Sequence, residues 1–150
     1  MGNEARAAVD DRLVAAAIAQ MDARQEPGRE GGAAAMYLDD GEIVTSIAFD
    51  PPNLYAGLCH ETGALLEAHR RGRAVTASVC VCRPAGSDQI LILAPCGVCQ
   101  ERLLAWGREV QVAVAEPDDP TQWVSKPLSE ASPHFWGAPF AAEIWPERTA

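Results

Sequence analysis

Two short motifs place three cysteines and a glutamate where two helices are expected to begin. Cys59-His60-Glu61 lies before a run of strong helix formers that ends with basic residues and a glycine, and Pro95-Cys96-Gly97-Val98-Cys99 opens another helical segment. Residues three apart share a face of a helix, so Cys96 and Cys99 can point both sulfurs at one position. Gly97 is expected to permit a close backbone contact. If the two helices lie next to each other on a sheet, Cys59 supplies a third sulfur.

Three thiolates and a neighbouring carboxylate are suitable groups for a catalytic zinc site. Three cysteine ligands leave the fourth tetrahedral position of Zn²⁺ for water, whereas a structural site fills all four positions with protein ligands. The start of a helix favours a thiolate over a thiol and offsets part of the negative charge of such a centre. Glu61 follows Cys59 by two residues and is therefore predicted to take a proton from the water and return it elsewhere. The pattern indicates a hydrolytic site.

The rest of the sequence predicts one α/β domain. Apolar residues recur at helical spacing from Asn3 to Ala23, and the strand-like runs 33–38 and 42–49 flank Asp39-Asp40-Gly41, a typical hairpin turn. Further helices are predicted over 58–71 and 96–106, and further strands over 75–82, 89–93 and 110–115. The alternation favours a central sheet with helices packed on it. We expect a single domain over residues 1–150, with a core of about 4–136 and a tail over 137–150.

Composition and charge exclude several classes of function. The 150-residue chain has 12 Lys and Arg against 21 Asp and Glu, a formal net charge of -9, so polymeric nucleic acid is not an expected partner. No apolar run approaches the ~18 residues of a membrane span, and the acidic N-terminus is unlike a signal peptide. We therefore expect a cytoplasmic protein without a membrane partner. In a reducing compartment, five cysteines favour metal binding, catalysis or core packing over disulfides.

The order Cys-x-Glu and then Pro-Cys-x-x-Cys resembles the zinc-dependent cytidine deaminase superfamily, whose pattern begins with His or Cys. A cysteine as first ligand is similar to the small homotetrameric cytidine deaminases and the blasticidin S deaminases. The resemblance spans about residues 4–136 and implies a three-layer αβα fold around a central mixed sheet of about five strands. It implies that zinc is bound by Cys59, Cys96 and Cys99, and that Glu61 carries a proton from the attacking water to ring nitrogen 3 and then to the departing ammonia. It also implies a homotetramer, or a dimer, whose pockets are completed by neighbouring subunits.

The positions around this motif differ from the usual family pattern. Cytidine deaminases of this class usually carry Asn-x-Glu about ten residues before the first cysteine to hold the ribose. The aligned residues here are Ala48-Phe49-Asp50, of which Asp50 alone keeps a carboxylate. His60 replaces the usual Ala, and Thr62 replaces the Arg that commonly follows the catalytic Glu and eases the charge of the thiolates.

The resemblance also implies residues that contact a substrate. The carbonyl of Ala94 is expected to accept a hydrogen bond from the leaving amino group, and Phe135 or Trp136 is expected to close the pocket. The candidate substrate-binding residues are Phe49, Asp50, His60, Ala94, Phe135 and Trp136. The predicted activity is hydrolytic removal of the amino group at ring position 4 of a cytosine, in a free nucleoside or a related small molecule such as cytidine, a modified cytosine or blasticidin S.

Two interpretations without this chemistry remain open. Cys96 and Cys99 form a Cys-Gly-x-Cys pattern that also occurs in thiol redox pairs, although that interpretation leaves Glu61 without a role. A non-catalytic structural zinc site needs a fourth protein ligand, for which His60 is the nearest candidate. Cys80 and Cys82 lie two apart on an expected strand and are interpreted as core thiols.

Overall fold

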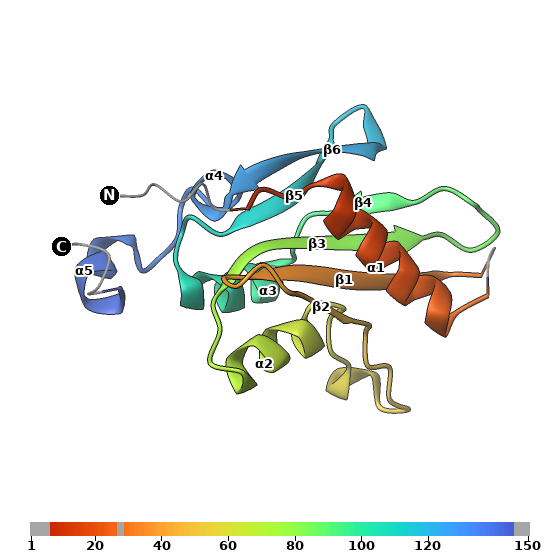
Figure 1. The fold of residues 1–150 in the computed structure, drawn as a ribbon, viewed down its shortest axis with the longest axis horizontal. Helices are drawn as coiled ribbons and strands as arrows, with labels where there is room; N and C mark the ends of the chain where they lie inside the picture. The colour runs from red at the N-terminus through yellow and green to blue at the C-terminus, as the bar shows by residue number, and fades with distance from the viewer. Residues whose placement is uncertain (1–6, 27–28, 146–150) are drawn as a thin grey trace.

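The structure, a computed structural model, describes residues 7–26 and 29–145 and contains one mixed sheet (Figure 1). Its strands run in the order β2-β1-β3-β5-β6, and β4 pairs with the end of β3. The strands are β1 (Gly31–Leu38), β2 (Ile43–Ser46), β3 (Val75–Arg83), β4 (Leu91–Leu93), β5 (Gln111–Glu116) and β6 (Asp119–Pro127). Only β3 and β5 pair in parallel among these strands. The expected mixed α/β sheet is confirmed, with six strands rather than five.

Helices cover both faces of the sheet and form the expected three layers. On one face, α1 (Asp11–Arg24) crosses in front of β1 and β3 in Figure 1 and buries Leu13, Ala17 and Met21 against them. On the other face, α2 (Thr62–Arg70) and α3 (Gly97–Leu103) enclose a second apolar cluster with β1, β2 and β5. The shorter helices are η1 (Leu54–Ala56), η2 (Leu104–Trp106), α4 (Leu128–Ala131), η3 (Ala138–Phe140) and α5 (Ala141–Ile144). Within the described ranges, no helix combines the length and the apolar character that a membrane span needs.

Local contacts determine where two of the predicted helices begin. The first helix starts at Asp11 and not near Asn3, because the Asp10 carboxylate accepts a hydrogen bond from the Leu13 N–H at 2.9 Å and so caps the helix there. Asn3 itself lies outside the described residues. The second helix starts at Thr62, four residues later than predicted, because Leu58 pairs with Phe49 in an isolated antiparallel bridge. The predicted hairpin is confirmed, and its turn requires the positive φ of 82° at Gly41.

Two features of the C-terminal third differ from the sequence-based expectation. Strand β6 was not predicted, because two prolines interrupt its pattern; as the last strand of the sheet it tolerates a proline near its start and another at its end. The predicted tail over 137–150 is partly structured, since it contains η3 and α5. Trp145 packs against the second core cluster and donates its ring N–H to the Leu104 carbonyl at 2.9 Å. Residues 146–150 lie outside the described part of the chain.

Candidate active site

The three cysteines of the two motifs meet at the starts of α2 and α3. Cys59 follows the bridge between Phe49 and Leu58, whereas Cys96 occupies the N-cap of α3 and Cys99 its first turn. Their three sulfurs lie within 4.8 Å of one another, and Cys59 Sγ and Cys96 Sγ are 3.5 Å apart. Cys99 is fully buried, Cys59 is half-buried and Cys96 is exposed, so the cluster is open to solvent on one side.

This cluster fits a tetrahedral metal ion. Zn–S bonds of about 2.3 Å at tetrahedral angles place sulfurs about 3.8 Å apart, close to the observed separations. Among the described residues, no fourth His, Cys, Asp or Glu shares the group. His60, the nearest candidate for a fourth ligand, instead has its Nδ1 engaged by the Ala48 N–H at 3.0 Å. The arrangement therefore leaves one coordination position free, as a catalytic site requires and a closed structural site does not.

Glu61 lies beside the three sulfurs in an almost dry environment. It occupies the N-cap position of α2, yet its side chain makes no capping hydrogen bond and is only 4% exposed. After burial, the negative charge of Glu61 is the next cause that raises the pKa of Cys99, which places this carboxylate close to the thiol. A buried carboxylate next to an open metal position is suited to accept and donate a proton.

The environment of each thiol separates Cys96 from its two neighbours. Burial opposes ionisation of Cys96, but the Cys99 backbone N–H and the Cys59 side chain more than compensate and lower its pKa. In contrast, the hydrogen bond to Cys96 and then burial raise the pKa of Cys59. The pKa of Cys96 is thus shifted in the direction expected at a helix start, while the pKa values of Cys59 and Cys99 are shifted toward the protonated form.

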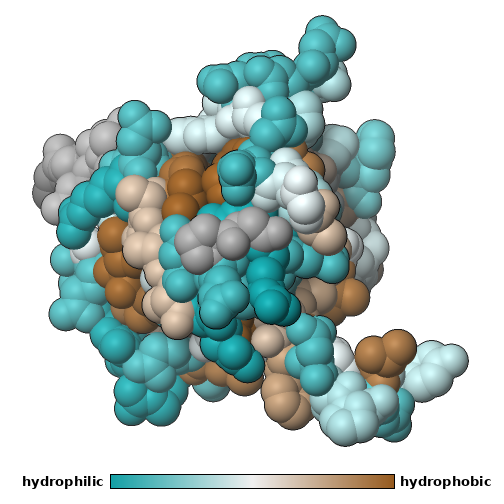
Figure 2. All heavy atoms as spheres, turned by 90° about the vertical axis from the view of Figure 1, so that its right-hand side faces the viewer, coloured by the Kyte–Doolittle hydropathy of each residue, from teal (hydrophilic) through white to brown (hydrophobic). Residues whose placement is uncertain are grey.

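Asp50 and His60 line the same polar cavity, of about 440 Å³, which reaches the cluster through His60, the residue between Cys59 and Glu61 in the chain. Its wall is completed by Gln25, Glu30, Gly31, Gly32, Ala48 and Cys82. Cys82 is half-buried at this wall, so the interpretation of it as a core thiol is wrong, whereas Cys80 is buried as expected. Gln25 and Glu30 come from the connection between α1 and β1, and the end of the molecule that carries it is mainly hydrophilic (Figure 2). In the sequence, nothing about Gln25 and Glu30 beyond their polar character indicated that they line this cavity.

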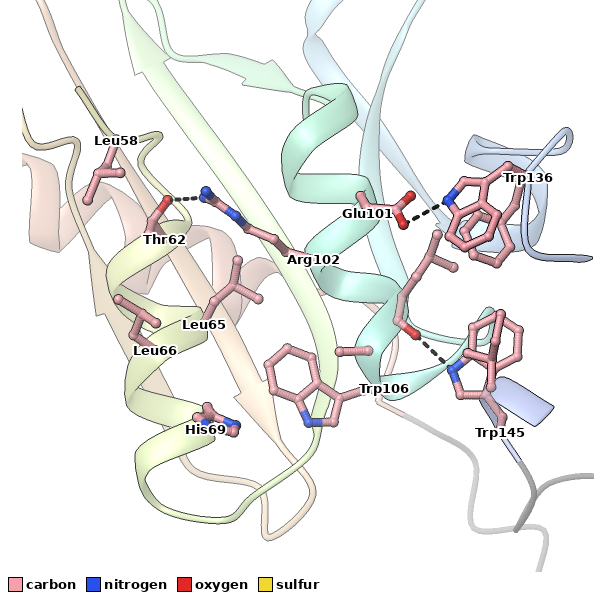
Figure 3. Close-up of a pocket in the computed structure, with 14 residues that line it drawn as sticks. Leu58, Thr62, Leu65, Leu66, His69, Glu101, Arg102, Trp106, Trp136 and Trp145 are labelled. Carbon is pink, nitrogen blue, oxygen red and sulfur yellow. Dashed lines mark hydrogen bonds between the residues drawn. The ribbon is translucent and has the colours of Figure 1, made fainter. Parts of the chain in front are cut away.

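Phe135 and Trp136 lie in a different place within one chain. They line an apolar groove of about 780 Å³ between α2, α3 and the C-terminal segment (Figure 3). The Trp136 ring N–H donates to the Glu101 carboxylate at 2.9 Å there. Ala94 lines neither hollow and is exposed just before Pro95, and Phe49 is 58% exposed. Of the six candidate substrate-binding residues, Asp50 and His60 therefore share the polar cavity, Phe135 and Trp136 share the apolar groove, and Phe49 and Ala94 line neither.

Two further findings bear on the motifs. Within the described part of the chain, an added Cβ at Gly97 would meet nothing within 4 Å, so the structure does not show the close backbone contact expected at that glycine. Arg102 of α3 donates from Nη1 to Thr62 Oγ1 at 2.8 Å and links the two helices that carry the cysteines (Figure 3). A guanidinium thus reaches the start of α2 from the other helix, although Thr62 replaces the usual Arg. This contact could not be predicted from the sequence, because Arg102 and Thr62 are 40 residues apart.

The mixed sheet and the thiols and carboxylate gathered at two helix starts define the class, an α/β protein in which three cysteines could hold a metal ion near a buried glutamate. Cytidine deaminase from Bacillus anthracis is 39% identical, with 93% of this chain and 97% of that chain covered and a TM-score of 0.83. Cytidine deaminase from Mycobacterium tuberculosis is 26% identical (86% and 98% covered, TM-score 0.62), and that from Burkholderia pseudomallei, 19% identical (85% and 99%, TM-score 0.65), shares the fold. Neither the family models nor the curated proteins compared with the chain include a match. The chain belongs to the cytidine deaminase family and is a hydrolase of the aminohydrolase class.

Proposed function

We propose that this protein is a zinc-dependent aminohydrolase that replaces the amino group at ring position 4 of a cytosine by oxygen, in a free nucleoside or related small molecule. The observation that carries the proposal is the group of three sulfurs within 4.8 Å of one another beside the buried Glu61. The similarity to the Bacillus anthracis cytidine deaminase supports the same chemistry. Cys59, Cys96 and Cys99 would hold the zinc.

In the proposed reaction, the cysteines would hold the metal and Glu61 would transfer protons. Bound zinc would supply a Lewis acid that makes a water molecule acidic enough to attack at neutral pH. Glu61 accepts a proton from the attacking water and donates it to ring nitrogen 3, and a second proton transfer lets the carbon–nitrogen bond break and ammonia leave. The near-complete burial of Glu61 keeps competing water away from this carboxylate. The reaction consumes one water and releases one ammonia for each carbonyl formed.

The polar cavity supports a nucleoside rather than a nucleotide as substrate. Among the residues that the structure describes, its lining contains the carboxylates of Asp50 and Glu30 and no lysine or arginine. Carboxylates accept hydrogen bonds from sugar hydroxyls or attract a cationic substituent such as the tail of blasticidin S, whereas they repel a phosphate. Asp50 would therefore contact the part of the substrate that lies away from the reacting carbon.

A substrate panel tests this function. With the zinc-loaded protein, ammonia release is measured for cytidine, deoxycytidine, cytosine, blasticidin S and cytidine 5′-monophosphate. We expect turnover of at least one uncharged or cationic compound, and kcat/KM for the monophosphate at least about tenfold below that for cytidine, because a repulsion of ~1.4 kcal/mol is a tenfold effect. Turnover of no cytosine compound would refute the proposed activity.

The apolar groove supports an assembly of several copies. Among its lining residues, Leu58, Leu66 and Trp136 are 41%, 60% and 66% exposed, an unusual density of large apolar side chains on one surface. We expect a homotetramer, with a dimer as the smaller alternative, and Phe135 or Trp136 near the pocket of a neighbouring subunit. Light scattering should then give about four times the chain mass of 16.0 kDa. A fully active monomer would contradict this expectation.

A further inference from the structure

His60 connects the cysteine cluster to the strand segment that leads to Asp50. Its Nδ1 accepts a hydrogen bond from the Ala48 backbone N–H at 3.0 Å, and its backbone carbonyl accepts from the Ser46 hydroxyl. The residue is therefore held by the last residue of β2 and by the segment that follows it. In the sequence, His60 lies directly between Cys59 and Glu61.

The same contacts close the base of a projecting loop, residues 50–57, which includes η1 (Figure 1). Phe49 and Leu58 exchange two backbone hydrogen bonds of 3.0 and 3.1 Å just outside it. The bridge between His60 and Ala48 extends this pairing toward β2. Asp50 is the first residue of this loop and directly follows Phe49. The hydrogen bonds at the base of the loop therefore determine where Asp50 lies.

The ring of His60 also forms part of the wall of the polar cavity. Because Nδ1 accepts a hydrogen bond, it carries no proton, and the ring proton is on Nε2. Nε2 faces the strand at Gly32, where an added Cβ would lie 2.5 Å from that nitrogen. A glycine is thus needed opposite the ring. The cavity wall holds the His60 ring N–H and the Gln25 side-chain amide as donors, beside the carboxylates of Glu30 and Asp50.

We propose that His60 is a positioning and specificity-determining residue: Nδ1 holds the segment before Asp50 at a fixed distance from Cys59 and Glu61, and Nε2–H binds an acceptor oxygen of the substrate in the polar cavity. This inference rests on the proposed function, because it assigns the two ends of one substrate to the cluster and to the cavity. The two nitrogens of the ring thus have different roles, and each can be replaced separately by an amide group of similar position.

Two variants separate these roles with cytidine as the probe. In His60→Asn, the amide oxygen takes the place of Nδ1 and can still accept from Ala48, but the donor at Nε2 is lost. We expect kcat within about twofold of wild type and KM raised about tenfold, since one hydrogen bond to substrate is worth ~1 kcal/mol or slightly more. In His60→Gln, the amide nitrogen takes the place of Nε2 and the acceptor is lost. The Ala48 N–H then loses its partner, and we expect kcat lowered about tenfold with a smaller change in KM.

A readout independent of activity accompanies the kinetics. Nitrogen-15 NMR of the wild-type histidine rings, assigned by comparison with His60→Asn, should show the His60 proton on Nε2. A proton on Nδ1, or equal kcat and KM changes in the two variants, would overturn the proposal. If wild type releases no ammonia from any cytosine compound, the proposed function fails by itself, whereas wild-type turnover with unchanged kinetics in both variants refutes only the role of His60.

Discussion

The Glu61→Gln protein should keep about one zinc per chain and lose ammonia release by about 10²–10⁴-fold in kcat, the usual contribution of a general acid–base group. Glutamine preserves the volume of the 4% exposed side chain and removes the ability to accept a proton. Because the sulfurs of the cluster are untouched, metal content should not change. Metal analysis together with a steady-state ammonia assay measures both quantities on one sample.

Glu67→Gln is the matched control for loss of a carboxylate from the same helical segment. Hydrogen bonds from Arg70 and then Arg71 lower the pKa of Glu67 to about 2, so this substitution also removes a full negative charge at neutral pH. Glu67 pairs with those arginines and lines neither hollow, so its variant should keep kcat within about twofold of wild type, as expected of a surface substitution. Full turnover by the Glu61→Gln protein would refute the acid–base role assigned to Glu61.

The cysteine cluster could be predicted from sequence because local rules determine most of it. The three-residue spacing of Cys96 and Cys99 puts both sulfurs on one side of a helical turn, whatever surrounds that turn. The Asp-Gly turn likewise determines the hairpin of β1 and β2. Only the approach of Cys59 required a tertiary assumption, namely that α2 and α3 lie next to each other on one face of the sheet.

The cavity and the groove could not be predicted in this way, because long-range packing creates them. Gln25 and Glu30 reach the polar cavity from the far end of α1, and no local pattern connects them with Asp50. The link between Arg102 and Thr62 joins residues 40 apart in sequence. His60 was singled out as a departure from the family pattern, but its contact with Ala48 depends on how the chain returns after the loop over 50–57.

Removing one sulfur should have the second large effect, because three ligands are the fewest that leave a catalytic zinc tightly held. We expect Cys99→Ala to contain less than about 0.1 zinc per chain after dialysis and to show no measurable ammonia release. Cys99 is fully buried, so no solvent molecule can readily take the place of its sulfur on the inner side of the cluster. Wild type should also gain thermal stability with added zinc, by about 4 kcal/mol at a thousand times its Kd, whereas the variant should gain almost none.

Cys80→Ala separates loss of the metal from loss of a buried thiol. Cys80 is 4% exposed and close enough to the cluster for the charge of Glu61 to add to burial in raising its pKa, yet its sulfur is not part of the metal-binding group. Both variants remove one buried sulfur and leave a similar small void, so both lose some packing energy. Only Cys99→Ala should lose zinc and the thermal response to it. Equal zinc content in the two variants would show that the metal is held elsewhere, and equal loss in both would show that the site needs a packed interior more than it needs three particular ligands.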